Sequence, residues 1–281
     1  MIEEPAGRID YEETGDGPTI VFVPGSCSTG AAWRPVMAAL NGGFRCVTTS
    51  LLGYGGTAER RTPRDPSIAH EAEAVEAVIR RTAGRVHLVG HSFGGLVALA
   101  VALRGKIPLE SLTIAEAPAV ELLRELGEHQ HYRAFQDMSD AYFAAFRGGN
   151  EEAISMMIDF YGGAGAFASW PPKVRAYAAK TTPVNILDWA SAFGFPLSPA
   201  TLAAVKIPAL ILRGGASHPA MQRVNELLSV HIGGASLVTV NGAAHFMIST
   251  HPEYVARTIA HHVARAEQSE SATRHTEISP Y

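Results

Sequence analysis

The residues whose types and spacing could do chemistry begin with Gly90, Ser92 and Gly94, which form the pattern G-x-S-x-G. The run RVHLV precedes this pattern and the run GGLVALAVAL follows it, so we expect a strand, a sharp turn and a helix around Ser92. Such a turn strains the serine backbone and leaves no room for neighbouring side chains, which accounts for the two glycines. The pattern predicts a nucleophilic serine; the alternative is a serine that only caps a helix.

A serine hydroxyl needs an adjacent base before it can attack at neutral pH. Of the 12 histidines, His245 has the most favourable position, in a loop between the run SLVTV and the last helical stretch. That loop should open at the same edge of the sheet as Ser92. His91 is next to Ser92 in sequence, but its side chain should point elsewhere, and His87 should lie in the core. We therefore predict that His245 is the general base.

The elements that must position these residues are strand-like runs that alternate with amphipathic stretches. This order predicts an α/β protein with a mostly parallel sheet and helices on both faces. The runs are continuously apolar, as expected for strands buried on both sides. The expected strands are Thr19–Val23, Phe44–Thr49, Arg85–Val89, Ser111–Ala115, Ala209–Arg213 and Ser236–Val240. The expected helices are Ala31–Leu40, Ile68–Arg81, Phe93–Leu103, Met221–Val230 and Glu253–Ala266.

One long segment breaks this alternation. Residues 120–205 contain helix-like stretches, glycine clusters and several aromatic residues, but no clear strand. We interpret this segment as a helical insertion in a core formed by residues 1–119 and 206–266. Residues 267–281 are polar and lack periodicity, which predicts a loose C-terminal tail.

Composition limits the class of protein and its partners. The chain has 281 residues, of which 47% are hydrophobic and 18% charged, with a net charge of −4. These values are typical of a globular protein, and nothing in them suggests nucleic acid or an anionic membrane as a partner. The N-terminus lacks the features of a secretory signal, and the cysteines, Cys27 and Cys46, are too few for a disulfide framework. We expect a cytoplasmic protein with no metal and no cofactor.

Four segments resemble the α/β-hydrolase superfamily in its cap-bearing form. They are VFVPGSCSTGAAW (Val21–Trp33), LLGYGGT (Leu51–Thr57), GHSFGG (Gly90–Gly95) and GAAHF (Gly242–Phe246). The resemblance extends from about Pro18 to Arg265. It implies the α/β-hydrolase fold: a mostly parallel sheet with helices on both faces and a helical cap inserted after the sixth strand. It does not identify a substrate.

The resemblance also implies an oxyanion hole made of backbone N–H groups. The histidine-glycine pair that usually precedes the first of these groups is here Pro24-Gly25. Because the contact comes from the backbone, this change need not abolish it. By position, Ser26 or Cys27 would supply one N–H group and Phe93 the other.

The third member of the triad departs from the family pattern. The family's acid normally follows the strand after the cap, but that position holds Ser217. Glu116 directly follows the strand Ser111–Ala115, and some α/β-hydrolases place their acid at the end of this strand. We therefore favour Glu116 as the residue that orients His245; the alternative is a non-catalytic residue beneath the cap. Asp188 in the cap is a weaker candidate.

A serine nucleophile predicts acyl transfer. The expected function is a serine hydrolase that cleaves a carboxylic ester or lactone of small to medium apolar substrates through an acyl-enzyme. An acyltransferase, a carbon–carbon bond hydrolase and a non-catalytic ligand-binding protein remain alternatives. Four cap and loop residues are expected to line the substrate pocket, although aromatic residues there could equally form the core of the cap. They are Phe160, Trp170, Trp189 and His218.

Overall fold

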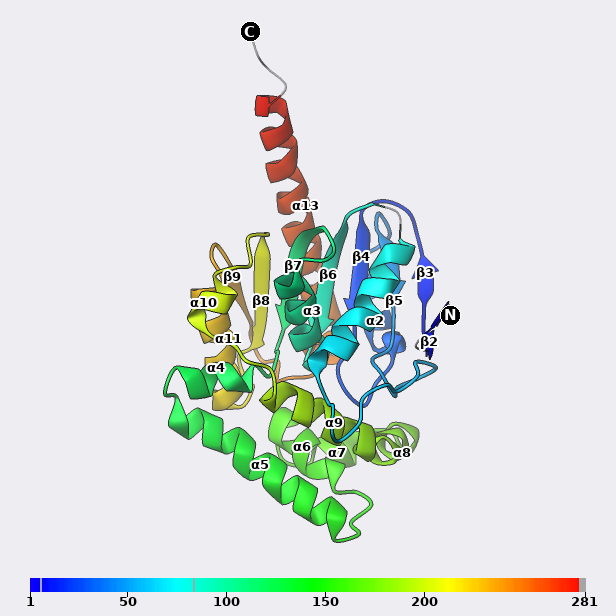
Figure 1. Ribbon diagram of the computed structural model, residues 1–281, viewed down its shortest axis with the longest axis vertical. Helices are drawn as coiled ribbons and strands as arrows, with labels where there is room; N and C mark the ends of the chain where they lie inside the picture. Colours follow the sequence, from blue (N-terminus) through cyan, green and yellow to red (C-terminus); the bar gives the residue numbers. More distant parts are fainter. Residues whose placement is uncertain (6, 83, 278–281) are drawn as a thin grey trace.

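A seven-stranded sheet forms the centre of the computed structural model, which describes residues 1–5, 7–82 and 84–277 (Figure 1). The strand order is β3-β5-β4-β6-β7-β8-β9. Strand β3 is antiparallel to β5, and the other neighbouring strands pair in parallel. The strands are β3 (Glu12–Thr14), β4 (Thr19–Val23), β5 (Arg45–Thr48), β6 (Val86–His91), β7 (Leu109–Ala115), β8 (Ala209–Gly214) and β9 (Ser236–Val240). A separate antiparallel pair joins β1 (Ile2–Glu4) to β2 (Gly7–Ile9).

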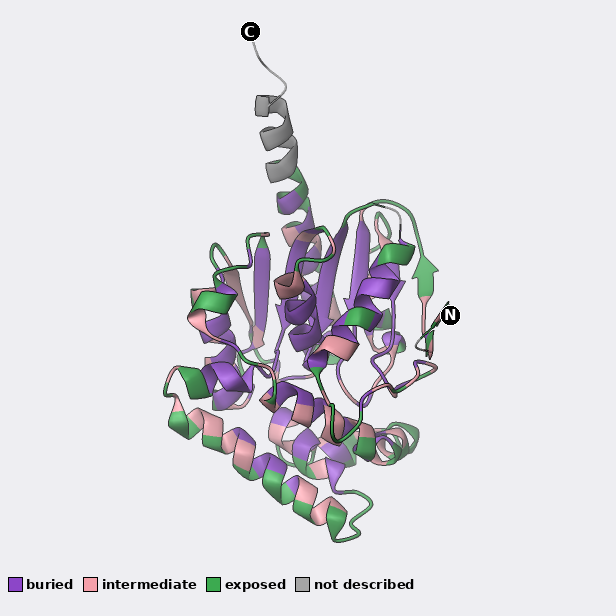
Figure 2. Cartoon of the chain, viewed as in Figure 1, coloured by how far each residue is buried: buried purple, intermediate pink, exposed green. Residues whose placement is uncertain are grey.

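Alternate residues of the central strands face two separate hydrophobic clusters. In β4, Val21 and Val23 belong to one cluster, and Ile20 and Phe22 belong to the other. Side chains in a strand alternate between the two faces of the sheet, so a strand covered on both sides must be apolar throughout. This explains why β4 and β6 are continuously buried (Figure 2).

Helices cover both faces of the sheet, as the sequence predicts. The first cluster contains residues of α2 (Ile68–Arg81) and α3 (Phe93–Arg104). The second contains residues of α1 (Arg34–Ala39), which follows the 3-10 turn η1 (Gly30–Trp33), and of α13 (Pro252–Glu277). The remaining core helices are α11 (Pro219–His231) and α12 (Met247–Thr250).

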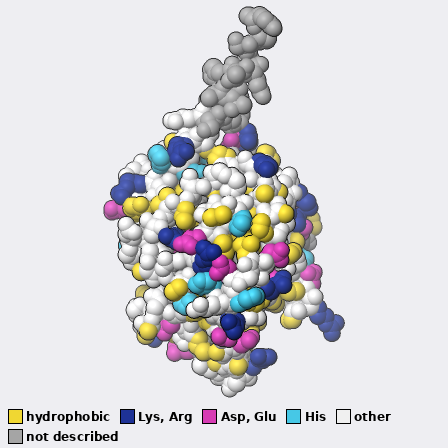
Figure 3. Space-filling model, turned by 90° about the vertical axis from the view of Figure 1, so that its left-hand side faces the viewer, with side chains coloured by type: hydrophobic (Ala, Val, Ile, Leu, Met, Phe, Trp, Pro, Cys, Tyr) yellow, Lys and Arg dark blue, Asp and Glu magenta, His cyan; other side chains and the backbone are white. Residues whose placement is uncertain are grey.

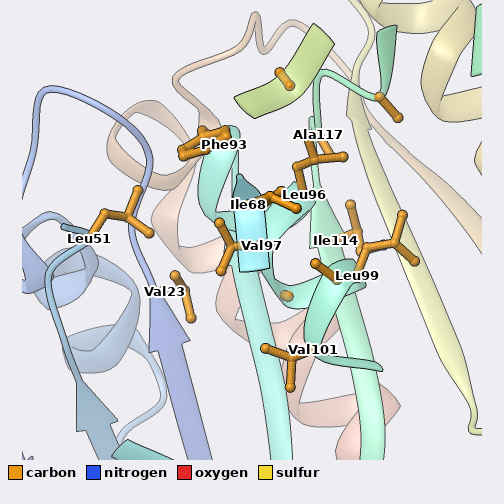
Figure 4. Packing of buried hydrophobic residues seen from close by; sticks show 14 of the residues in the cluster. Val23, Leu51, Ile68, Phe93, Leu96, Val97, Leu99, Val101, Ile114 and Ala117 are labelled. Carbon is orange, nitrogen blue, oxygen red and sulfur yellow. The ribbon is translucent and has the colours of Figure 1, made fainter. Parts of the chain in front are cut away.

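Helix α3 fixes the position of its own N-terminus by packing its apolar side chains onto the sheet. Figure 4 shows Leu96 and Leu99 of this helix beside Ile114 of β7 and Ala117, with Phe93 at the start of the helix. All five side chains are buried. Burying a Leu or Phe side chain contributes roughly 1.5–3 kcal/mol, so this packing holds the helix start firmly against the ends of the strands.

The insertion predicted at residues 120–205 lies between β7 and β8 and contains only helices in the structure. It covers one end of the sheet (Figure 1). Its helices are α4 (Val120–Glu125), α5 (His129–Arg147), α6 (Ile154–Gly162), α7 (Ala166–Ser169), α8 (Pro172–Lys180), α9 (Thr182–Phe193) and α10 (Pro199–Leu202). We call this segment the cap.

The C-terminal segment differs from the sequence-based expectation. Residues 267–277, predicted to belong to a loose tail, continue helix α13 as far as Glu277, and residues 278–281 lie outside the described residues. Their high content of polar residues removes the apolar periodicity on which the prediction relied, but it does not prevent a helix from continuing.

The molecular surface carries charges of both signs. On the face shown in Figure 3, acidic and basic side chains lie close together rather than in separate fields. Ion pairs between Arg213 and Glu226 and between Arg223 and Glu128 are examples of such neighbours. Among the described residues, none of the helices combines the length and apolarity that crossing a membrane requires.

Candidate active site

Ser92 lies at the turn between β6 and α3, in a backbone conformation that few residues adopt. Its φ angle is 55°, in the left-handed region. The turn is tight enough to require glycine on both sides of the serine. A Cβ atom on Gly90 would lie 2.2 Å from the carbonyl oxygen of Gly94, and one on Gly94 would lie 2.1 Å from that of Pro24. Strain of this kind costs about 1–3 kcal/mol and often marks a functional site.

His245 lies in the loop between β9 and α12, and the fold brings it to Ser92 across 153 residues of sequence. Its Nε2 atom is 2.9 Å from Ser92 Oγ. Strands β6 and β9 run in the same direction within one sheet, so the residues that follow them meet at the same edge. The imidazole is 2% exposed, which removes competing water from the Ser92–His245 contact.

Glu116 lies directly after β7, and its carboxylate has a partner for each oxygen. Oε2 is 3.2 Å from Nδ1 of His245, and Oε1 accepts a hydrogen bond of 2.7 Å from the backbone N–H of Gly214. The side chain is fully buried, and the backbone φ angle is 55°. The three predicted residues thus form a continuous hydrogen-bonded chain from Ser92 through His245 to Glu116.

Ser217, at the position where the family pattern has its acid, makes no contact with this chain of hydrogen bonds. Its hydroxyl is buried, and among the described residues it has no hydrogen-bond partner. Asp188, the weaker candidate, is bonded to other residues than His245. Its carboxylate accepts hydrogen bonds from Ser26, Tyr54 and Arg61.

Two further groups near Ser92 are held in their neutral forms. Burial and the proximity of His245 lower the pKa of His91 to about 3, and its Nε2–H donates to the carbonyl oxygen of His245 at 2.8 Å. His91 therefore supports the His245 loop through this hydrogen bond. Burial raises the pKa of the Cys27 thiol to about 12, so no thiolate competes with Ser92 near neutral pH.

A cavity of about 670 Å³ lies between the core and the cap, with Ser92 and His245 in its wall. Its volume suits a small or medium ligand, and its lining is mostly apolar. Ser26, Cys27 and Phe93, the predicted sources of the oxyanion hole, also line it. A Cβ atom on Gly25 would come within 2.9 Å of Ser92 Cβ, so the loop that contains Ser26 runs directly beside the serine.

The predicted pocket residues divide into two pairs. Trp170 and Trp189 lie in the cavity wall. Phe160 and His218 are not among the residues that line this cavity, which corrects the sequence-based expectation. Their rings stack on each other instead, with centroids 4.1 Å apart.

Sequence reasoning gave no specific role to Tyr161, which the structure places on the imidazole of His245. The two rings stack with centroids 4.1 Å apart and planes 16° apart. Tyr161 belongs to α6, so the cap covers one face of the imidazole. Only the presence of an aromatic residue in the cap could have suggested this contact, because nothing in the sequence pattern relates position 161 to position 245. Among the described residues, no cluster of His, Cys, Asp or Glu could hold a metal ion.

Comparison with known proteins identifies the family. The sequence profile of the family described as "Alpha/beta hydrolase family" matches residues 20–258, which include most of the core, the whole cap and all three residues of the hydrogen-bonded chain. The chain belongs to the alpha/beta hydrolase family.

A likeness to solved structures extends over nearly the whole of this alpha/beta hydrolase. A thermophilic esterase from Thermogutta terrifontis superposes with a TM-score of 0.73 at 20% identity, covering 92% of this chain and 93% of that one. At this identity the likeness shows the fold alone.

Relatives among curated proteins share a shorter segment with this alpha/beta hydrolase. A putative carbamate hydrolase RutD from Agrobacterium fabrum is 34% identical over 115 residues, which are 41% of this chain and 42% of the relative. A pimeloyl-(acyl-carrier protein) methyl ester esterase from Aeromonas salmonicida is 33% identical over 111 residues, 39% of this chain and 42% of the relative. The shared segments thus span about two fifths of each of these relatives.

Proposed function

We propose that this alpha/beta hydrolase is a serine hydrolase that cleaves carboxylic esters or lactones of small to medium apolar substrates through an acyl-enzyme. One observation carries the proposal: the hydrogen-bonded chain Ser92–His245–Glu116 ends at a mostly apolar cavity. A serine activated by a neighbouring imidazole is suited to attack a carbonyl carbon. Two of the curated relatives are named as a methyl ester esterase and a putative carbamate hydrolase. Esters and carbamates both contain a carbonyl carbon that a serine can attack.

In the first step, Ser92 Oγ attacks the carbonyl carbon of the substrate while Nε2 of His245 takes the hydroxyl proton. Glu116 accepts a hydrogen bond from Nδ1–H of His245, which keeps Nε2 free to accept that proton and stabilises the imidazolium that forms. His245 then gives the proton to the departing alcohol oxygen. The products of this step are the free alcohol and an ester between the acyl group and Ser92.

In the second step, water replaces the alcohol and the same groups act in reverse. His245 takes a proton from the water as its oxygen attacks the acyl carbon, and then returns a proton to Ser92 Oγ as the acid leaves. Each attack places a negative charge on the former carbonyl oxygen. We assign the stabilisation of this charge to the backbone N–H groups of Ser26 and Phe93, because both residues line the cavity beside Ser92.

We choose Ser26 over Cys27 because Ser26 directly follows Gly25, the residue at which this loop runs closest to Ser92. Phe93 is the first residue of α3, where the backbone N–H has no partner within the helix.

A series of p-nitrophenyl esters from acetate to decanoate tests this function. We expect the wild-type protein to turn over at least one short or medium ester and Ser92→Ala to release no p-nitrophenol above the uncatalysed rate. Adding an alcohol or amine acceptor distinguishes hydrolysis from acyl transfer, because a transferase would form the new ester or amide faster than the free acid. A folded wild-type protein that hydrolyses none of the esters contradicts the proposal.

A further inference from the structure

A buried carboxylate in the cap holds the loop that contains Ser26. Asp188 lies in α9 and is 2% exposed. Its Oδ2 atom accepts a hydrogen bond of 2.5 Å from Ser26 Oγ and another of 2.7 Å from the Tyr54 hydroxyl. Its Oδ1 atom accepts from Arg61 at 2.7 Å. Among the hydrogen-bond partners of Asp188, Ser26 comes from the loop after β4, while Tyr54 and Arg61 come from the segment between β5 and α2.

The loop after β4 needs such support because part of it is strained. Cys27 has a φ angle of 58°, in a backbone region that residues other than glycine rarely adopt. A conformation of this kind persists only where surrounding contacts hold it in place. The buried Cys27 thiol lies close to Thr181 of the cap and to Tyr54, and Tyr54 donates a hydrogen bond to Asp188. One buried network therefore holds Ser26 through a direct hydrogen bond and lies against its neighbour Cys27.

The charge balance of this network keeps Asp188 in place. The Arg61 guanidinium is fully buried and lies 2.7 Å from Asp188, 2.8 Å from Glu59 and 3.2 Å from Glu71. Removing a carboxylate partner from a buried guanidinium strongly destabilises the folded protein. The ion pair with Arg61 therefore keeps the Asp188 carboxylate within hydrogen-bonding distance of Ser26. The cap and the core are thereby connected through an ion pair directly behind the loop.

We propose that Asp188 is a positioning residue, which holds the oxyanion loop through the Ser26 hydroxyl and thereby sets the place of the Ser26 N–H group beside Ser92. The inference rests on the proposed function for its catalytic consequence. In this arrangement the core alone does not complete the oxyanion hole. Displacement of α9 removes the acceptor of Ser26 Oγ and releases the loop, so the cap controls both the pocket and the stabilisation of the developing negative charge.

Three variants separate this role from a general contribution to folding. Asp188→Asn removes the acceptor but also leaves Arg61 with one carboxylate fewer. Ser26→Ala removes only the donor and leaves the contacts of Asp188 with Tyr54 and Arg61 intact. Ser191→Ala is the matched control, because it deletes another buried hydroxyl of α9, which bonds to the carbonyl oxygens of Pro66 and Leu187 and accepts a long contact of 3.5 Å from Arg61 but makes no bond to the loop. It therefore disturbs the surroundings of Arg61 without removing the Ser26–Asp188 bond.

The first readout is steady-state kinetics on p-nitrophenyl esters, together with the inhibition constant of a boronic acid that mimics the tetrahedral intermediate. Loss of an oxyanion donor lowers kcat by about 100- to 1,000-fold, so displacement of one should lower it by about 10- to 100-fold. For Ser26→Ala and Asp188→Asn we expect this loss in kcat with KM nearly unchanged, and a matching rise in the inhibition constant. Ser191→Ala should stay within about twofold of wild type.

The second readout does not depend on activity. Native protein is treated with iodoacetamide, and labelling of Cys27 and Cys46 is followed by peptide mass spectrometry. Both thiols are buried, and Cys46 lies in β5, away from the loop, so its labelling reports opening of the whole molecule. We expect the ratio of Cys27 to Cys46 labelling rates to rise about tenfold in Ser26→Ala and Asp188→Asn, and to stay unchanged in Ser191→Ala.

The outcomes distinguish this inference from the proposed function. If wild-type protein and Ser191→Ala hydrolyse esters and Ser26→Ala matches them in kcat, the positioning role is wrong while the hydrolase function stands. If wild-type protein hydrolyses no ester, the function is wrong and the labelling ratio alone decides whether Asp188 holds the loop. An unchanged ratio in Ser26→Ala overturns the inference in either case.

Discussion

Glu116→Gln changes one atom of the hydrogen-bonded chain, and the structure indicates how the new side chain must orient. The N–H of Gly214 donates to one carboxylate oxygen at 2.7 Å, and the other oxygen faces His245 Nδ1 at 3.2 Å. A glutamine has one oxygen and one NH₂ group. Its oxygen must stay with Gly214, because two donors would otherwise face each other in a buried site. The NH₂ group then faces Nδ1 of His245.

This orientation reverses the imidazole tautomer. Nδ1 must accept a hydrogen bond from the amide, so the proton moves to Nε2, and Nε2 can no longer accept the proton of Ser92. A wrong tautomer of this kind costs a serine hydrolase about 10,000-fold in kcat, which corresponds to about 5 kcal/mol in the activation free energy. Because the Glu116–His245 contact is longer than an ideal charge-assisted bond, we expect a loss of about 1,000- to 10,000-fold.

The assay is the initial rate of p-nitrophenyl ester hydrolysis, with the melting temperature measured on the same samples. Glu121→Gln is the control, because Glu121 is a buried carboxylate of α4 that pairs with Arg124 and does not line the cavity. Its kcat should stay within about twofold of wild type. If Glu116→Gln folds normally and retains kcat within a few-fold of wild type, the assignment of Glu116 as the triad acid is wrong.

Three further changes probe other parts of the structure. Burial raises the pKa of Glu71 from 4.5 to about 8, so the folded state holds a proton that the unfolded state releases, and stability falls as pH rises between these two values. Glu71→Gln removes this titration, so the melting temperature of the variant minus that of the wild-type protein should increase from pH 5 to pH 8. A difference that does not vary with pH would refute the pKa shift. Gly94→Ala forces a Cβ atom against a backbone oxygen and should abolish soluble expression, whereas the Cβ atom of Gly233→Ala would lie in open space and should be tolerated. Similar yields of soluble protein for the two variants would count against the tight turn. Tyr161→Ala removes the ring stacked on the imidazole of His245 and should lower kcat by about tenfold, while Tyr161→Phe should stay near wild type; steady-state kinetics measures the difference, and equal kcat in the two variants would mean that the stacking has no role.

The parts of the fold that could be predicted from the sequence are those whose pattern is strong and local. The sequence predicts a helix at Ile68–Arg81, because a serine cap precedes a clear amphipathic repeat, and α2 has the same bounds in the structure. The continuous apolar runs of β4 and β6 likewise predict buried strands. By contrast, β1, β2 and β3 have three residues each and are largely polar, so only their pairing partners reveal them as strands.

In the candidate site, too, the residues that could be predicted are those with a strong local sequence pattern. Ser92 could be predicted from its own turn, and His245 from the strand before it. The placement of Glu116 needed the observation that no carboxylate occupies position 217. Contacts made across the cavity could not be predicted, because they depend on how the cap docks. Asp188 illustrates this, since only tertiary structure brings it to Ser26.

The central claim is that Ser92 is an activated nucleophile, and covalent trapping tests it most directly. Wild-type protein, Ser92→Ala and His245→Ala are incubated with a fluorophosphonate, and the modified residue is located by peptide mass spectrometry. We expect a single adduct on Ser92 in the wild-type protein, none in Ser92→Ala, and labelling slowed at least about 100-fold in His245→Ala. An adduct on any other residue, or equal labelling of Ser92 with and without His245, would contradict the assignment of Ser92 as an activated nucleophile.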